Sequence, residues 1–260
     1  KILSSEYRDK VPVYATIWSK DFKDDETLSS RCEEILNQGY GGIKIYPLQK
    51  RTIDQAAICV SKIRQTLGFN IPLMLDLACP NDPNVSLKLA PLVKEFKPYW
   101  FEEPVDGEAT RTLIEIKNQT GLRIVTGEKQ CGINHFIETL AADAVDIFNP
   151  DISSVGGIID MIKIIELSHK KNVKVSPHCW NSMSIAASAM IHLCMSFPNT
   201  EMAEFFPEYI PYTLKFCNKN FEINNWFIEL DNREGLGVKI DTNLLMENTS
   251  SYKFSILDKN

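Results

Sequence analysis

The chain has 260 residues, of which 44% are hydrophobic and 24% are charged, and its formal net charge at pH 7 is −6. These values are typical of a soluble globular protein with one large, well-buried core. The acidic balance, with a pI near 5.4, argues against a nucleic-acid partner, and no apolar run reaches the ~20 residues that span a membrane. The seven cysteines are scattered and form no CxxC pair. That pattern favours a cytoplasmic location over a disulfide framework or a zinc site.

Eight short runs rich in Val, Ile and aromatic residues predict strands. They are residues 11–17, 41–47, 72–77, 99–104, 123–128, 145–151, 173–178 and 201–206. Most do not alternate apolar and polar residues, as expected of strands that are covered on both faces. Helical periodicity lies between them, most clearly over 52–68 and 158–170. Strands that alternate with helices predict parallel βα units. We therefore expect an α/β fold, a TIM-like barrel of seven or eight units, with an open doubly wound sheet as the alternative.

The rhythm of strands and helices ends at about Asn218. An Asn-rich stretch and the run Glu234-Gly235-Leu236-Gly237-Val238 predict loops and one extra strand. We therefore divide the chain into a barrel domain, residues 1–217, which carries the metal and catalytic site, and a C-terminal extension, residues 218–260, which packs outside the barrel.

Ionisable residues close six of the predicted strands at a near-constant interval. They are Asp76, Glu102, Glu128, Asp151, His178 and Glu204, and the steps between them are 26, 26, 23, 27 and 26 residues. The C-terminal ends of the parallel strands of a barrel meet at one face, where active sites are built. A register kept over six units predicts a site at that face.

The first three of these residues suggest a metal. Asp76, Glu102 and Glu128 come from consecutive strands, and three crowded carboxylates repel one another unless a cation or a proton intervenes. Oxygen-only ligands favour Mg²⁺, with Mn²⁺ as a substitute, over Zn²⁺. The alternative is that the three residues are exposed loop acids without a common ligand.

Several motifs resemble a known family. Leu75-Asp76, Phe101-Glu102-Glu103-Pro104 and Thr126-Gly127-Glu128 are similar to the three metal-ligand signatures of the enolase superfamily. Asp151 and His178 resemble the dyad of the mandelate racemase branch of its mandelate racemase and muconate lactonizing enzyme family.

The resemblance implies that the chain is the C-terminal barrel domain of such a protein. It implies that Glu102 is the ligand of its pair and that Glu103 supports the structure. It also implies a symmetric homo-oligomer. The family's N-terminal α+β capping domain, which closes the barrel mouth, has no counterpart among these residues.

The second predicted strand offers two candidate catalytic side chains. Lys44 and Tyr46 are two residues apart, so both can point into the barrel mouth. A buried lysine needs negative charge, which a metal-bound substrate carboxylate would provide; the alternative is a lysine whose head reaches the surface. The family usually has Lys-x-Lys here. Tyr46 can replace the second lysine as a base if Lys44 and the metal lower its pKa.

Three further residues complete the predicted catalytic set. Asp151 beside His178 would fix the imidazole tautomer and raise its basicity. Glu204 lies next to aromatic residues, which would raise its pKa and let it donate a hydrogen bond. The resemblance places this acid against the substrate carboxylate. Ala78 stands where relatives often carry an asparagine that contacts the substrate.

The resemblance implies abstraction of a proton α to a carboxylate of a small-molecule substrate, with Mg²⁺ and Lys44 stabilising the enediolate. Because Tyr46 replaces the usual lysine, we favour dehydration of a sugar acid. Racemisation or epimerisation, and cycloisomerisation of a lactone, use the same enolate and stay open. A non-catalytic barrel that binds a ligand or partner is the remaining alternative if the capping domain is truly absent.

Overall fold

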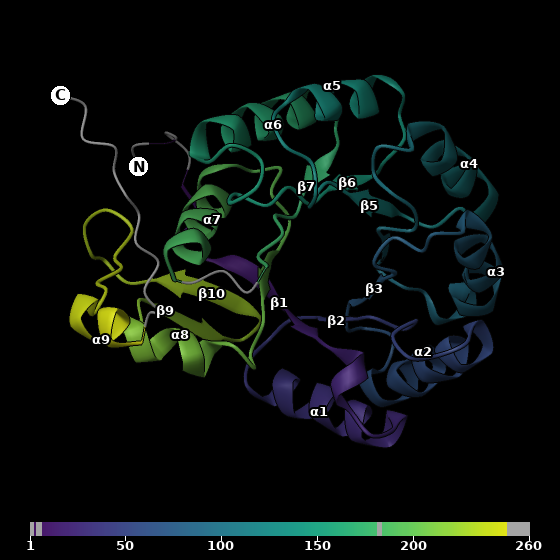
Figure 1. Ribbon diagram of the computed structural model, residues 1–260, viewed down its shortest axis with the longest axis horizontal. Helices are drawn as coiled ribbons and strands as arrows, with labels where there is room; N and C mark the ends of the chain where they lie inside the picture. Colours follow the sequence, from purple (N-terminus) through teal and green to yellow (C-terminus); the bar gives the residue numbers. More distant parts are fainter. Residues whose placement is uncertain (1–2, 4–6, 181–183, 249–260) are drawn as a thin grey trace.

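The computed structural model describes residues 3, 7–180 and 184–248. Eight parallel strands form the centre of the protein, each inside one of the predicted runs (Figure 1). They are β1 (Val11–Ile17), β2 (Ile43–Ile45), β3 (Leu73–Asp76), β4 (Trp100–Glu102), β5 (Ile124–Thr126), β6 (Ile147–Phe148), β7 (Lys174–Val175) and β8 (Ala203–Phe205). Each strand pairs with the next from β1 to β7, and β8 pairs with β1. A parallel bridge between Val175 and Thr200 joins β7 to the approach to β8. The sheet is therefore closed, as predicted, and the open sheet is excluded.

Helices surround this barrel (Figure 1). They are α1 (Asp25–Asn37), α2 (Ile53–Leu67), α3 (Pro83–Val93), α4 (Thr110–Thr120), α5 (Asn134–Ala141), α6 (Ile158–Lys170) and α7 (Ser184–Ser196), with 3₁₀ turns at Ser19–Asp21 and Lys94–Phe96. Helix α2 begins with a capping box between Thr52 and Gln55 and ends at Gly68, whose φ is 70°. Its buried stripe includes Val60 and Ile63. The prediction of helices over 52–68 and 158–170 is confirmed to within one residue at each end.

Alternation along the strands separates the two sides of the sheet. One cluster of buried side chains lies inside the barrel: Tyr14, Met74, Trp100, Val125, Ile147 and Met202. Their chain neighbours belong to a larger cluster that includes the buried faces of the helices. Lys44 is in register with Met74 on the adjacent strand. The pleat therefore turns Lys44 into the barrel while Ile43 and Ile45 pack under the helices.

The strands are shorter than the predicted runs. Glu103 has φ 44°, and Ala78 and Cys79 have φ 54° and 56°. A left-handed residue cannot continue a strand, so β4 ends at Glu102 although the apolar sequence suggests a longer element. Strain of this kind gathers at functional sites.

The segment after β8 contains helix α8 (Ile210–Phe216), strands β9 (Phe221–Asn224) and β10 (Phe227–Leu230), and helix α9 (Thr242–Glu247). β9 and β10 form an antiparallel hairpin, where the sequence predicted loops and one strand. Its turn residues, Asn225 and Trp226, have φ 47° and 74°, as the tight turns that suit hairpins require. β10 pairs with the start of β1. A side chain on Gly41 would meet the Trp226 Cβ atom at 2.7 Å, so this contact needs glycine.

None of the helices in the described part of the chain is both long enough and apolar enough to cross a bilayer.

Candidate active site

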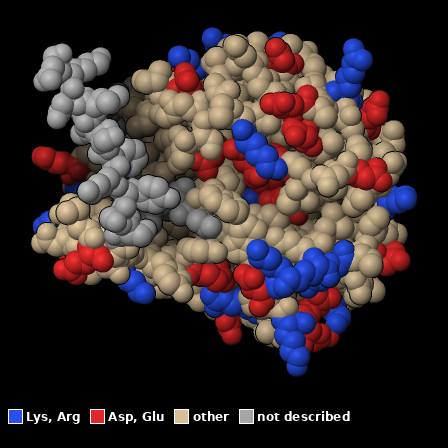
Figure 2. Space-filling view, viewed as in Figure 1, with Lys and Arg blue, Asp and Glu red and all other residues tan. Residues whose placement is uncertain are grey.

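The three predicted metal ligands lie together at the C-terminal ends of neighbouring strands. Asp76 and Glu102 end β3 and β4 and are paired in register, and Glu128 lies two residues beyond β5. One carboxylate oxygen from each lies within 4.8 Å of the others. Asp76 and Glu102 are buried, and the Glu128 side chain is 15% exposed. The alternative of three exposed loop acids is therefore wrong. Acidic side chains gather in the hollow at the centre of this face (Figure 2).

Burial and mutual repulsion make it costly for the three carboxylates of this triad to be ionised together. Burial, followed by Asp76, Glu204 and Glu128, raises the pKa of Glu102 well above its ordinary value, while Lys44 opposes the shift. Burial likewise raises the pKa of Glu128 to about 7, although His178 works against it. A divalent cation would relieve this cost, and an oxygen-only donor set suits Mg²⁺. The residues present therefore fit such an ion.

Lys44 lies among the carboxylates. Its Nζ atom is 2.6 Å from Glu102 Oε1, 2.7 Å from Glu204 Oε1 and 3.5 Å from Asp76 Oδ2. The side chain is fully buried, so the alternative of a lysine that reaches the surface is wrong. Burial alone would lower the pKa of Lys44, but Glu102 and Glu204 raise it well above its ordinary value.

Two residues that were not predicted hold Glu102 in place. The Trp100 indole Nε1 donates to Glu102 Oε2 at 2.7 Å, and Asn149 Nδ2 donates to Oε1 at 3.0 Å. Both are buried. The sequence contained a signal for both. Trp100 stands two residues before Glu102, in WFE, and Asn149 stands two residues before Asp151, in NPD. Positions two apart on a strand share a face.

The predicted dyad is formed. His178 Nδ1 is 2.8 Å from Asp151 Oδ2, and Asp151 accepts further hydrogen bonds from the backbone N–H groups of Ser153 and Trp180. Burial would raise the pKa of Asp151, but the hydrogen bond and charge of His178 and the backbone donors lower it. With Nδ1 engaged by an ionised carboxylate, Nε2 is the ring atom left to exchange a proton.

His178 Nε2 faces the other carboxylates. It is 3.4 Å from Glu128 Oε2 and 3.9 Å from Glu204 Oε2. It is buried and has no hydrogen-bond partner among the described residues. Burial would lower the pKa of His178, but Glu204, Asp151 and Glu128 outweigh it and raise that pKa to about 9. The imidazole is therefore placed to take or give a proton at the centre of the site.

The pKa of Glu204 differs from the expectation. Burial would raise the pKa of Glu204, but Lys44, His178 and the Thr16 hydroxyl lower it, so the predicted upward shift is wrong. The backbone N–H of Cys179 also donates to Glu204 Oε2 at 3.0 Å. Neighbouring cations and donors therefore outweigh the aromatic surroundings.

Tyr46 is buried, with its ring stacked on Trp18 at a centroid distance of 4.7 Å. Burial and then Asp76 raise the pKa of Tyr46 well above its ordinary value, with Lys44 opposing. The condition for a tyrosine base, a pKa lowered by Lys44 and the metal, is therefore not met by the protein alone. The hydroxyl stays protonated at neutral pH.

A cavity of about 430 Å³ opens beside the dyad. It is lined by Glu128, Lys129, Asp151, Ser153, Ser154, His178 and Trp180. Lys129, Ser153 and Ser154 were not predicted. They lie on the loops that follow β5 and β6, and loops carry no periodic signal that would mark them.

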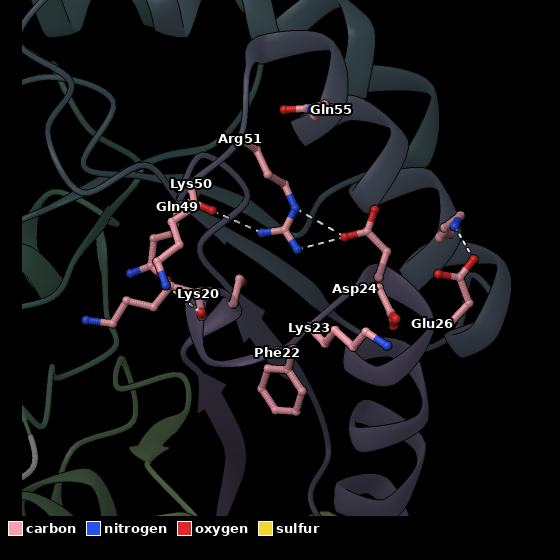
Figure 3. A pocket seen from close by; sticks show the side chains of 12 residues that line it. Lys20, Phe22, Lys23, Asp24, Glu26, Gln49, Lys50, Arg51 and Gln55 are labelled. Atoms are coloured by element: carbon pink, nitrogen blue, oxygen red, sulfur yellow. Dashed lines mark hydrogen bonds and ion pairs between the residues drawn. The ribbon is translucent and has the colours of Figure 1, made fainter.

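A second hollow of about 400 Å³ lies at the rim, between the loops that follow β1 and β2 (Figure 3). The Arg51 guanidinium binds Asp25 Oδ1 through Nε at 3.1 Å and Nη2 at 2.7 Å. Lys62 is paired with Glu26. The Arg51–Asp25 pair joins the loop before α2 to the start of α1, and the Lys62–Glu26 pair joins the two helices. We therefore assign the hollow a structural role.

Comparisons with known proteins agree with this geometry. The family described as enolase C-terminal domain-like matches residues 27–244. D-gluconate dehydratase of Thermoproteus tenax is 23% identical over 254 residues, which cover 94% of this chain and 51% of that protein. The chain thus spans about half the length of that curated relative.

Two solved structures share the fold. One, described as an enolase from the environmental genome shotgun sequencing of the Sargasso Sea, is 44% identical with a TM-score of 0.91, over 96% of this chain and 66% of that one. The other is the 3,6-anhydro-D-galactonate cycloisomerase of Zobellia galactanivorans. It is 26% identical with a TM-score of 0.86, over 95% of this chain and 68% of that one. The barrel, its triad of carboxylates and the family match together show that this chain belongs to the enolase superfamily, within the enolase C-terminal domain-like family.

Proposed function

We propose that the full-length protein removes water from a sugar acid in a Mg²⁺-dependent reaction that begins with abstraction of the proton α to the carboxylate. The observation that carries this proposal is the convergence of the carboxylate triad, Lys44 and the His178–Asp151 dyad at the mouth of the barrel. The relatives add support, because they include a D-gluconate dehydratase.

Asp76, Glu102 and Glu128 would hold the ion. A bound Mg²⁺ would supply Lewis-acid charge beside the substrate carboxylate. Trp100 and Asn149 already donate to Glu102. They therefore restrict its rotation and prepare the site, and such outer partners commonly decide metal affinity.

Lys44 would stabilise the negative charge that develops when the α-proton leaves. Its position is fixed by Glu102 and Glu204 on either side. A preorganised ammonium in a buried site stabilises such charge more strongly than water does. Glu204, itself ionised, would keep Lys44 charged and oriented.

His178 would take the α-proton on Nε2, with Asp151 stabilising the imidazolium that forms. A cation held by Glu128 reduces one of the negative charges that raise the pKa of His178, which brings the ring closer to its neutral, basic form. Tyr46 directly follows β2, which lies three strands from β7 around the barrel. Its protonated hydroxyl would give a proton to the departing β-hydroxyl, which leaves as water. The tyrosinate formed would regain a proton from solvent, and the His178 imidazolium would lose one. The resulting enol then tautomerises to a 2-keto-3-deoxy acid.

Cellular location and assembly are part of the same proposal. The seven cysteines are scattered along the chain without a CxxC pair, which suits a reducing cytoplasm. The family resemblance supports a homo-oligomer with a small carboxylate as its ligand.

A screen of acid sugars and their lactones against the full-length protein with Mg²⁺ tests the reaction. We expect a 2-keto-3-deoxy product, with solvent deuterium at C3 if the enzyme protonates the enol. Exchange at the α-carbon with inversion and no keto product would instead identify a racemase or epimerase. No turnover by protein that binds Mg²⁺ would identify a non-catalytic barrel.

Lactone cycloisomerisation is the second candidate. It is favoured by the 26% identity to a 3,6-anhydro-D-galactonate cycloisomerase. Rearrangement in the same screen without loss of water would establish it.

A further inference from the structure

Lys129 places a cation beside the proposed reaction centre without taking part in the proposed chemistry. It directly follows Glu128, and its Nζ atom is 3.9 Å from Glu128 Oε1. Its side chain is 49% exposed and lines the 430 Å³ cavity together with Ser153 and Ser154. This part of the cavity therefore offers an ammonium and two hydroxyl-bearing residues.

Cys79 and Glu103 hold the Lys129 ammonium in place. Its Nζ atom is 2.8 Å from Cys79 Sγ and 3.5 Å from Glu103 Oε2. Glu103 is fully buried, and its oxygens also accept from the Thr126 hydroxyl at 2.5 Å and from the Cys79 thiol at 2.7 Å. A lysine fixed in this way has lost much of its rotamer freedom before a ligand arrives, so it binds at lower entropic cost.

Lys44 and Lys129 differ in their surroundings. Lys44 is fully buried against the metal triad and Glu204, whereas the Lys129 side chain is 49% exposed. Apart from His178, Lys129 is the cation among the described residues that line the cavity. Cys79 Sγ accepts one of the three ammonium protons of Lys129, so others remain for a ligand. A charge-assisted hydrogen bond to a carboxylate is about twice as strong as one to a neutral oxygen.

We propose that Lys129, with Ser153 and Ser154, forms a subsite for a second carboxylate of the substrate. The substrate class would then be an aldarate, a sugar diacid, rather than an aldonate. This inference rests on the proposed function and narrows it. The subsite is a determinant of specificity and takes no part in proton transfer.

The matched pair galactarate and galactonate tests it, because the two acids share their configuration and differ at C6. Binding is measured by calorimetry with Mg²⁺ in a full-length His178→Asn background, which prevents turnover. We expect galactarate to bind more tightly. Adding Lys129→Met should weaken galactarate roughly tenfold or more and galactonate much less, as loss of a charged hydrogen bond predicts. Lys129→Arg should keep the preference.

A matched control is available in Lys163, which is 52% exposed and paired with Asp160 on α6, outside the cavity. Lys163→Met should leave both affinities unchanged. Titration with Mg²⁺ alone separates a direct effect from one transmitted through Glu128: if Lys129→Met weakens the ion, both acids should weaken together, and the subsite is overturned.

Tighter binding of galactonate, or equal losses for the two acids, also overturns the diacid subsite while leaving dehydration intact. The wild-type protein could also dehydrate no acid and yet bind the diacid in a way that Lys129→Met weakens. That result would keep the subsite and overturn the proposed function.

Discussion

Lys44 shows how a charged residue is retained in the interior of this barrel. It is surrounded by Glu102, Glu204 and Asp76, and the carboxylates keep it charged despite burial. A buried cluster of ion pairs often adds no net stability, because removing its charges from water costs free energy. The arrangement therefore favours function over stability as the reason for this residue.

Replacing Asp76 by asparagine should weaken Mg²⁺ binding while the fold remains. The change keeps the shape but removes one anionic ligand. Loss of an outer partner already costs about 10- to 100-fold in metal affinity, so we expect at least this much for a ligand. Titration calorimetry measures it, with Asp160→Asn on α6 as a control. Equal affinity in wild type and Asp76→Asn would remove Asp76 from the site.

His178→Asn should abolish turnover, with kcat falling by about 10²- to 10⁴-fold, the usual contribution of a general acid or base. Mg²⁺ affinity should change little, because His178 is not a ligand. The exposed His169 on α6 offers a control in His169→Asn. A His178→Asn enzyme with near-normal kcat would show that the residue is structural.

Among the elements, α2 illustrates a stability term that is independent of the site. The Thr52 hydroxyl accepts from the Gln55 backbone N–H at 3.3 Å, and the Gln55 side chain accepts from the Thr52 N–H at 2.9 Å. Together these bonds satisfy two donors at the start of the helix.

Thr52→Ala should therefore lower the free energy of unfolding by about 1 kcal/mol, as measured by urea denaturation. Thr52→Ser keeps the hydroxyl and should restore most of the loss. Unchanged stability in Thr52→Ala would mean that packing against α1 and α3, rather than the cap, determines where α2 begins.

At the scale of the whole molecule, pH and Mg²⁺ should be linked through Glu128 and His178. In the metal-free fold the pKa values of both groups are raised, to about 7 and about 9 respectively. The stability from Glu128 is therefore fully present below its unfolded pKa and lost as pH rises through about 7. That from His178 is lost as pH rises through about 9.

Metal-free protein should therefore lose stability as pH rises from about 4.5 toward 9. Mg²⁺ binds the ionised carboxylate, so the increase in Tm on adding Mg²⁺ should be larger at high pH than at low pH. Calorimetric melting in EDTA and in Mg²⁺ measures both effects. The same Mg²⁺-induced shift in Tm on both sides of pH 7 would contradict the linkage.

Much of the architecture could be read from the sequence. The eight apolar runs predicted the closed barrel, and the helical stripe of α2 predicted that helix, because periodicity is local and short-range. The grouping of Asp76, Glu102 and Glu128 could also be predicted, since parallel strands bring their C-terminal ends to one face of the barrel.

Only the tertiary structure decided how these groups are charged and supported. The pKa of Glu204 is lowered and that of Tyr46 raised, contrary to expectation, because burial and neighbouring charges come from strands far apart in the chain. The contacts of Asn149 with Glu102 and of Lys129 with Cys79 join different βα units. Strand spacing determined which residues meet, and three-dimensional packing determined their protonation, because desolvation and Coulomb interactions depend on distances in space.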